Sequence, residues 1–139
     1  MSYAASVALQ GAVYQRLRAD AVLSELVGDA IYDAMPVDAP SGVFVSLGPE
    51  EVRDAGDFDR AGSQHDFIVS VLSGTDESAG FAAVKTAAVA VAEALERAEL
   101  TLDRGDLAGM WFLRAKARRV ENGAARRVDL TFRARIDLD

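Results

Sequence analysis

The feature that most constrains the fold is a pair of alternating segments around Asn122 and Gly123, near the end of the 139-residue chain. Apolar side chains occupy every second position over residues 111–117 and again over residues 128–138. Because Asn-Gly is a favoured centre of a type I′ turn, the two segments are predicted to form a β-hairpin. One side of that hairpin would then be apolar, through the pairs Trp111 with Ala134, Leu113 with Phe132, Ala115 with Leu130 and Ala117 with Val128. A slip by one residue would destroy all four matches.

The opposite side of this hairpin is predicted to be basic, relieved by Asp129 opposite Lys116. Its basic residues are Arg114, Lys116, Arg118, Arg127, Arg133 and Arg135. The whole chain has a formal net charge of −7, yet residues 106–139 hold 8 basic and 5 acidic residues, against 7 and 17 in the preceding part. Charge separated in this way can steer self-association, since a positive face on one copy complements a negative face on the next.

Three interpretations of the basic side stay open. The default is a solvated or partner-facing sheet surface, and the next is an interface with an acidic element of another copy. A small nucleic-acid-binding protein that uses the basic hairpin is the least favoured, because only Phe112, at the edge, could stack on bases. The acidic chain as a whole also repels phosphate at long range.

The remaining pattern predicts an α+β fold, in which an antiparallel or mixed β-sheet with a C-terminal hairpin packs against one long helix and an N-terminal helical segment. The length fits a single domain over residues 1–139. The first helix should be capped by Ser2 and should bury one apolar face, made of Val7, Leu9, Val13, Tyr14 and Leu17. Asp20 and Gly28 are predicted to begin and end a second, short helix.

Three short strands and one long helix complete the predicted elements. The strands are expected at residues 31–35, 43–47 and 66–72, the last with Phe67, Val69 and Val71 on one face. Residues 76–98 have apolar positions at helical spacing and an alanine-rich stripe that permits close packing on a sheet.

Residues 48–63 are predicted to form a long acidic loop that is mobile or becomes ordered on a partner. The segment has three glycines, a proline and too few apolar residues to pack. Its acidic residues are Glu50, Glu51, Asp54, Asp57 and Asp59. Carboxylates in a loop without a scaffold are not held in a catalytic geometry, so we expect a solvated surface or a partner contact.

No catalytic, cofactor or metal site is predicted, and we expect the protein not to be an enzyme. Cysteine is absent and His65 is the only histidine, which excludes thiolate and histidine-cysteine zinc sites. His65 is expected to make an ordinary hydrogen bond at a strand edge, since its neighbour Asp66 points to the other face. The sequence has no stretch approaching the ~20 apolar residues of a membrane span.

The order of these segments resembles a known family. The opening SYAASVALQGAVYQRLRADAVLSELVGDAIYDAMP, the strands VFVSLG and HDFIVSVLS, the alanine-rich helix and the closing WFLRAKARRVENGAARRVDLTFRARI are together similar to the tail-completion, or tail-terminator, proteins of long-tailed bacteriophages. The likeness covers nearly the whole chain. It is closest to the version in the gene transfer agents of alphaproteobacteria.

The resemblance implies a structural role. Such proteins form a homo-oligomeric ring, usually a hexamer, on the head-proximal end of the tail tube, where the ring stops tube growth and meets the head–tail connector or stopper protein. DNA would pass through the lumen without specific binding, and the protein would move from the bacterial cytoplasm into the tail of the particle. A head-side connector or stopper ring protein is the alternative within this class. On this view the basic hairpin side meets a neighbouring subunit or the tube, and the acidic loop faces the lumen or a neighbour.

Overall fold

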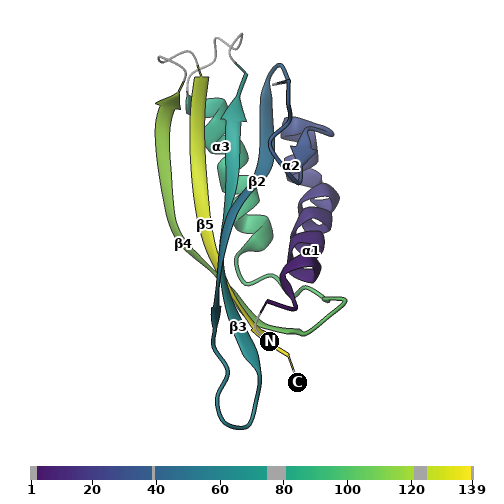
Figure 1. Ribbon diagram of the computed structural model, residues 1–139. Coiled ribbons are helices and arrows are strands. Elements are labelled where there is room, and N and C mark those ends of the chain that lie inside the picture. Colours follow the sequence, from purple (N-terminus) through teal and green to yellow (C-terminus); the bar gives the residue numbers. More distant parts are fainter. Residues whose placement is uncertain (1–2, 39, 75–80, 121–124, 139) are drawn as a thin grey trace.

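The computed structural model describes the chain except for residues 1–2, 39, 75–80, 121–124 and 139 (Figure 1). Over these ranges the elements follow in the order α1 (Ser6–Ala19), α2 (Ala21–Val27), β1 (Ile31–Tyr32), β2 (Val43–Asp54), β3 (Gly62–Ser73), α3 (Phe81–Leu95), β4 (Asp106–Val120) and β5 (Ala125–Asp137). Among the described residues, none of the helices combines the length and the apolar character needed to cross a membrane.

In the described part of the chain the strands form one five-stranded sheet in the order β1-β2-β3-β5-β4. The short strand β1 runs parallel to β2, and the other neighbours are antiparallel. The helices lie along one side of this sheet (Figure 1). The predicted α+β class, with a mixed sheet and a C-terminal hairpin packed on helices, is therefore confirmed.

The core lies between the sheet and the helices. The predicted inward face of β3 is confirmed, since Phe67, Val69 and Val71 are buried in the core. The same core contains the fully buried Phe132 of β5. The rings of Phe67 and Phe132 stack with their centroids 5.7 Å apart. Helix α3 approaches closely because its buried face is largely alanine, and that face consists of Val84, Ala87, Ala88, Ala90, Val91, Ala94 and Leu95.

The first helix buries a narrower face than predicted. Leu9, Val13 and Leu17 are buried as expected, but the prediction is wrong for Val7, whose side chain is 83 % exposed. Two residues before Leu9, the helical turn points Val7 away from the core. Ser2, the predicted cap, lies outside the described residues, and Ala5 occupies the N-cap position without a side-chain hydrogen bond.

The second helix begins and ends as predicted. The carboxylate of Asp20 accepts a hydrogen bond from the backbone N–H of Leu23 at 2.9 Å, which satisfies one of the free donors of the first turn. Gly28 ends the helix with a φ of 61°, a conformation that favours glycine. The long helix, predicted over residues 76–98, is described from Phe81 to Leu95.

The predicted acidic loop at residues 48–63 is shorter than expected. Strand β2 continues to Asp54 and β3 starts at Gly62, so only residues 55–61 connect them. The sequence pattern misses this because the ladder of β3 holds the second half of β2 as a strand, in spite of an irregularity between Leu47 and Glu50. The β2–β3 hairpin extends beyond the rest of the sheet (Figure 1).

The predicted register of the C-terminal hairpin is half correct. Ala117 pairs with Val128 and Ala115 with Leu130, as expected. A β-bulge between Phe112 and Arg114 then shifts the pairing by one residue, so that Phe112 faces Phe132 and Met110 faces Ala134. The predicted pairs Leu113 with Phe132 and Trp111 with Ala134 are therefore wrong. The turn over residues 121–124 lies outside the described residues.

The apolar side of β4 is also less buried than predicted. Ala115 and Ala117 face the helix side but are exposed, because β4 is the edge strand and the helices cover its neighbours more fully. Among the described residues of β4, Met110 is the one whose side chain is buried in the core. The edge strand is thus accessible on both faces over most of its length.

Candidate assembly surface

The predicted basic residues lie together on the side of the sheet that faces away from the helices. They come from β4 and β5, and we call them the arginine face: Arg114, Lys116, Arg118, Arg127, Arg133 and Arg135. They share this side because each alternates along its strand with a residue that points to the helix layer. Lys116 lies opposite Asp129, as predicted.

One part of the arginine face is neutralised within the chain by Asp129. The carboxylate of Asp129 accepts hydrogen bonds from Ser70 Oγ at 2.6 Å and from Arg127 Nε at 2.8 Å, and Arg118 lies 3.5 Å away. Partial burial raises the pKa of Asp129, but the bonds from Ser70 and Arg127 outweigh it, so that the pKa is lowered. Asp129 is therefore ionised and partnered at neutral pH.

A second neutralised pair joins β5 to β3. Arg133 donates from Nε and Nη2 to the two carboxylate oxygens of Asp66, at 2.8 and 3.0 Å. This two-pronged hydrogen bond holds the pKa of Asp66 below its ordinary value, and it raises the pKa of Arg133. Both Arg127 and Arg133 thus have partners within their own subunit, which the sequence pattern did not indicate.

The remaining positive charge lies toward the sheet edge. Within the described residues, Arg114 and Lys116 of β4 form no ion pair, and Arg135 has a long one, with Nε 3.9 Å from Asp137. Exposed lysine and arginine on an edge strand discourage uncontrolled strand pairing. The same charges are available to an acidic partner.

Two apolar side chains, Trp111 and Leu113, interrupt the arginine face. At the bulge Leu113 is the extra residue, and the shift turns Trp111 to the same side as its partner Arg133. The indole lies against Gly109, where an added Cβ would be 2.7 Å from Trp111 Cζ2. The result is a hollow of about 350 Å³, here called the Trp111 groove, lined by Gln64, Trp111, Leu113, Arg133 and Arg135.

The acidic residues predicted to share one loop are separated by the extended β2. Glu51 and Arg53 form an exposed ion pair at 3.0 Å on the strand, and Asp54 is the last residue of β2. Asp57 and Asp59 lie in the connection of residues 55–61, which we call the hairpin tip. Glu50 points to the helix side instead, where Ser6 of α1 contacts it. Only Asp57 and Asp59 therefore keep the predicted position on a projecting loop.

Glu50 also belongs to a partly buried network that the sequence analysis missed. His65 Nδ1 lies 3.0 Å from Glu50 Oε2, and His65 Nε2 lies 2.8 Å from Ser63 Oγ. A serine, a histidine and a carboxylate in this order resemble a nucleophile with its base, but Ser63 and His65 have no exposed surface. A substrate cannot reach the hydroxyl, so we assign the network to stability.

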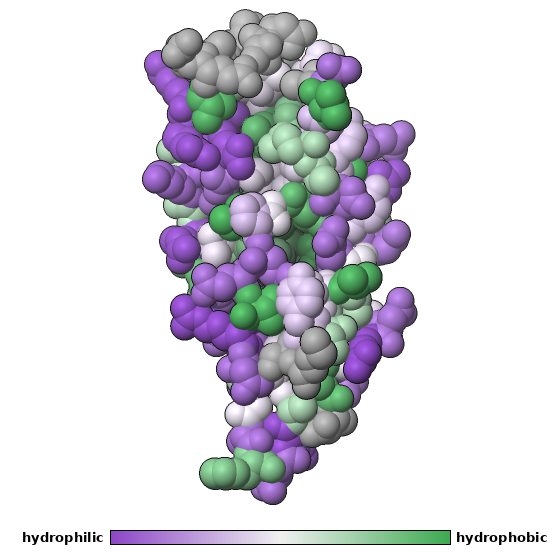
Figure 2. All heavy atoms as spheres, viewed as in Figure 1, coloured by the Kyte–Doolittle hydropathy of each residue, from purple (hydrophilic) through white to green (hydrophobic). Residues whose placement is uncertain are grey.

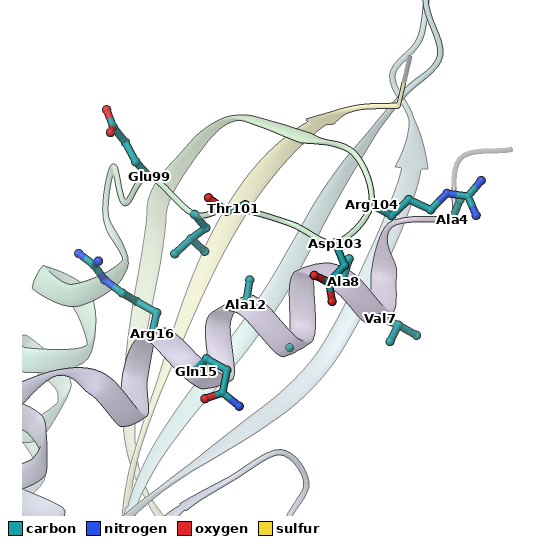
Figure 3. Close-up of a pocket in the computed structure, with 12 residues that line it drawn as sticks. Ala4, Val7, Ala8, Ala12, Gln15, Arg16, Glu99, Thr101, Asp103 and Arg104 are labelled. Carbon is teal, nitrogen blue, oxygen red and sulfur yellow. The ribbon is translucent and has the colours of Figure 1, made fainter.

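A larger hollow lies between α1 and the segment before β4 (Figure 3). It measures about 780 Å³ and has mostly small side chains along α1, such as Ala8, Gly11 and Ala12. Acidic and basic side chains line it in equal numbers, namely Arg16, Arg104, Glu99 and Asp103. This balance gives the hollow no preference for a charged ligand.

Comparison with known proteins decides the family. The model of the family described as "Tail completion protein gp17" matches residues 11–137. The chain belongs to this family. The match confirms the resemblance to tail completion proteins that the order of the segments predicted.

A solved structure extends this result to nearly all of the chain of this tail completion protein. The chain is 59 % identical to a chain in the virion of a native gene transfer agent (GTA) particle, with a TM-score of 0.89. The match covers 98 % of this chain and 99 % of that one. The predicted closeness to the gene transfer agent version is therefore confirmed. No curated protein matches the chain.

Proposed function

We propose that the protein is a structural, non-enzymatic component of a phage-like particle, a ring that terminates the tail tube and joins the tail to the head. The observation that carries the proposal is the full-length likeness, at 59 % identity, to a chain of a gene transfer agent virion. Membership of a tail completion family points to the same place in the particle. The protein would be made in the bacterial cytoplasm and would end in the tail.

The distribution of charge supports assembly with copies of itself and with other particle proteins. Arg114 and Lys116 leave the edge of the arginine face positive, whereas Asp57 and Asp59 give the projecting hairpin tip exposed acidic groups. Opposite charges at different places on one subunit favour a head-to-tail contact between copies, and such contacts close into rings when the rotation allows. A hexameric ring of this kind would contact the tube protein on one side and the connector or stopper on the other.

DNA would pass through the ring without specific binding. Asp66 and Asp129 neutralise part of the arginine face, which removes charge that a phosphate backbone would need. The net charge of −7 also disfavours nucleic acid at long range. These observations make a dedicated nucleic-acid-binding role a weaker proposal than assembly.

Deletion of the gene in a particle-producing strain, with electron microscopy of the products, tests the proposal. We expect tail tubes of uncontrolled length that are not attached to heads, and a return to normal particles when the wild-type gene is supplied. Tails of normal length beside heads that have lost their DNA would instead indicate a head-side stopper. Complete, normal particles in the deletion strain would reject both roles.

A further inference from the structure

Phe58, at the hairpin tip, is the most exposed large apolar side chain in the described part of the protein. Its side chain is fully exposed, between Asp57 and Asp59. In the space-filling view, hydrophobic surface appears at the far end of this projection, beside hydrophilic surface (Figure 2). An aromatic side chain in this position gains nothing from its own fold, since it packs on no core.

The hairpin tip is nevertheless tightly built. Asp57 Oδ1 accepts hydrogen bonds from the backbone N–H groups of Asp59 at 2.9 Å and Arg60 at 2.8 Å, and the Asp57 N–H donates to the carbonyl of Arg60. At Gly56 an added Cβ would lie 2.6 Å from the carbonyl oxygen of Arg60, so the turn requires glycine. Phe58 is therefore presented from a defined turn, which lowers the entropy cost of binding.

The Trp111 groove has the chemistry to receive this side chain. Trp111 is 45 % exposed and offers an aromatic surface beside Leu113. Arg135 lines the same groove with a partly exposed side chain, whose ion pair is the long one to Asp137. A phenylalanine between two aspartates thus complements, in polarity and charge, an aromatic and aliphatic surface bordered by arginines.

The two features lie at different places on one chain. The hairpin tip projects past the end of the sheet (Figure 1), whereas the groove lies on the face of β4 and β5. Each copy therefore carries both halves of a contact, and joining them head to tail repeats the contact around a ring.

We propose that Phe58 of one copy inserts into the Trp111 groove of a second copy, with Asp59 directed at Arg135. This inference rests on the proposed ring and names the contact that holds neighbouring subunits. Trp111 is the central residue of the groove, in agreement with the high share of tryptophan among residues that dominate binding interfaces.

Cross-linking within particles tests the contact directly. The natural chain lacks cysteine, so an Arg60→Cys, Leu113→Cys double variant has two unique thiols and keeps Phe58. A short bis-maleimide reagent should convert it into a ladder of chain multiples. An Arg60→Cys, Val89→Cys variant, with its second thiol on the exposed side of α3, is the matched control and should stay largely monomeric.

Each other result of the cross-linking counts against the inference. Equal ladders in the two variants, or no ladder in either, would overturn it, as would a product of the Arg60→Cys thiol with a different protein. Particles that lack the chain would overturn the proposed function and this inference with it.

Mixing two variants in solution provides an independent test. Phe58→Ala and Trp111→Ala should each weaken self-association by about thirtyfold, as expected for a central interface residue. A mixture should form one-to-one pairs, because the first variant keeps its groove and the second keeps its Phe58. Native mass spectrometry measures both effects, and Val89→Ala is the control that should associate like the wild type.

The outcomes separate this inference from the ring proposal. Wild-type association by both variants would overturn the Phe58 contact and leave the ring standing. A wild-type chain that stays monomeric at high concentration, both alone and with tube protein, would overturn the ring itself. Circular dichroism checks that both variants fold, which we expect since neither side chain belongs to the core.

Discussion

The imidazole of His65, on strand β3, lies 3.0 Å from the carboxylate of Glu50 on β2, and it has no exposed surface. Glu50 in turn accepts a hydrogen bond from Ser6 Oγ at 2.7 Å, at the start of α1. The network therefore ties the first helix to the root of the projecting hairpin. Its members lie 15 and 44 residues apart in the sequence.

Replacing His65 should destabilise the fold, because we assign its hydrogen-bond network to stability. His65→Ala leaves the buried hydroxyl of Ser63 without its partner and opens a cavity, so we expect a loss of about 2–4 kcal/mol in the free energy of unfolding. Urea denaturation measures it. Glu51→Gln, on the exposed neighbour of Glu50, is the control and should change stability by less than about 0.5 kcal/mol. Equal effects of the two variants would contradict the network.

The sequence predicted strand β3, but neither the second half of β2 nor the network. Alternation identified β3 and its inward residues, since the pattern is local. Pairing of His65 with Glu50 depends on the second half of β2 being a strand, whereas its Gly48, Pro49 and acidic residues are typical of a loop. The prediction of an ordinary hydrogen bond for His65 rested on its neighbour Asp66, which does point to the opposite face and bonds Arg133.

The ion pair between Asp66 and Arg133 should make stability depend on acid. The pKa of Asp66 is lower in the folded protein than its ordinary value of 3.8, so the pair stabilises the fold above that pH. Its contribution is lost as the pH falls through 3.8 toward the folded pKa. Because the pair is partly exposed, we expect at most about 1 kcal/mol.

The measurement compares urea denaturation of the wild type and Asp66→Asn across the acid range. The two should differ at pH 7 and converge well below pH 3.8, where the wild-type carboxylate is protonated as well. A difference that stays constant down to the lowest pH would show that the variant acts through packing instead of charge.

Phe132 should be the most sensitive core position. Its buried ring stacks on Phe67 and meets the edge of Phe112, with centroids 5.7 and 5.9 Å away. Phe132→Ala removes all of these contacts and should cost about 3–5 kcal/mol. Thermal and urea unfolding measure this loss. Val37→Ala, at a fully exposed side chain, is the control, and a comparable loss there would contradict the assignment of the core.

In the C-terminal hairpin, the prediction of strand pairing from the sequence pattern fails at the bulge before Arg114. Alternation and the Asn-Gly turn correctly predicted the pairs nearest the turn, such as Ala117 with Val128. One extra residue, Leu113, then reverses which side the preceding residues of β4 face. The apolar character of Leu113 and Trp111 favours the core in either register. No local signal separates a tryptophan in the core from one placed beside arginines on the open face.

Gly109 should control the position of Trp111. An alanine Cβ there would lie 2.7 Å from Cζ2 and 2.9 Å from Cη2 of the indole, closer than side chains approach, so Gly109→Ala must displace the ring. The chain has one tryptophan, and its fluorescence therefore reports this movement without interference. We expect a shifted emission maximum and a loss of stability of about 1–3 kcal/mol.

Gly11→Ala is the matched control, since an added Cβ at Gly11 meets nothing within 4 Å. In α1 that alanine should leave the emission unchanged and stabilise the protein by about 0.5–1 kcal/mol. An unchanged emission maximum in Gly109→Ala would contradict the contact between Trp111 and Gly109.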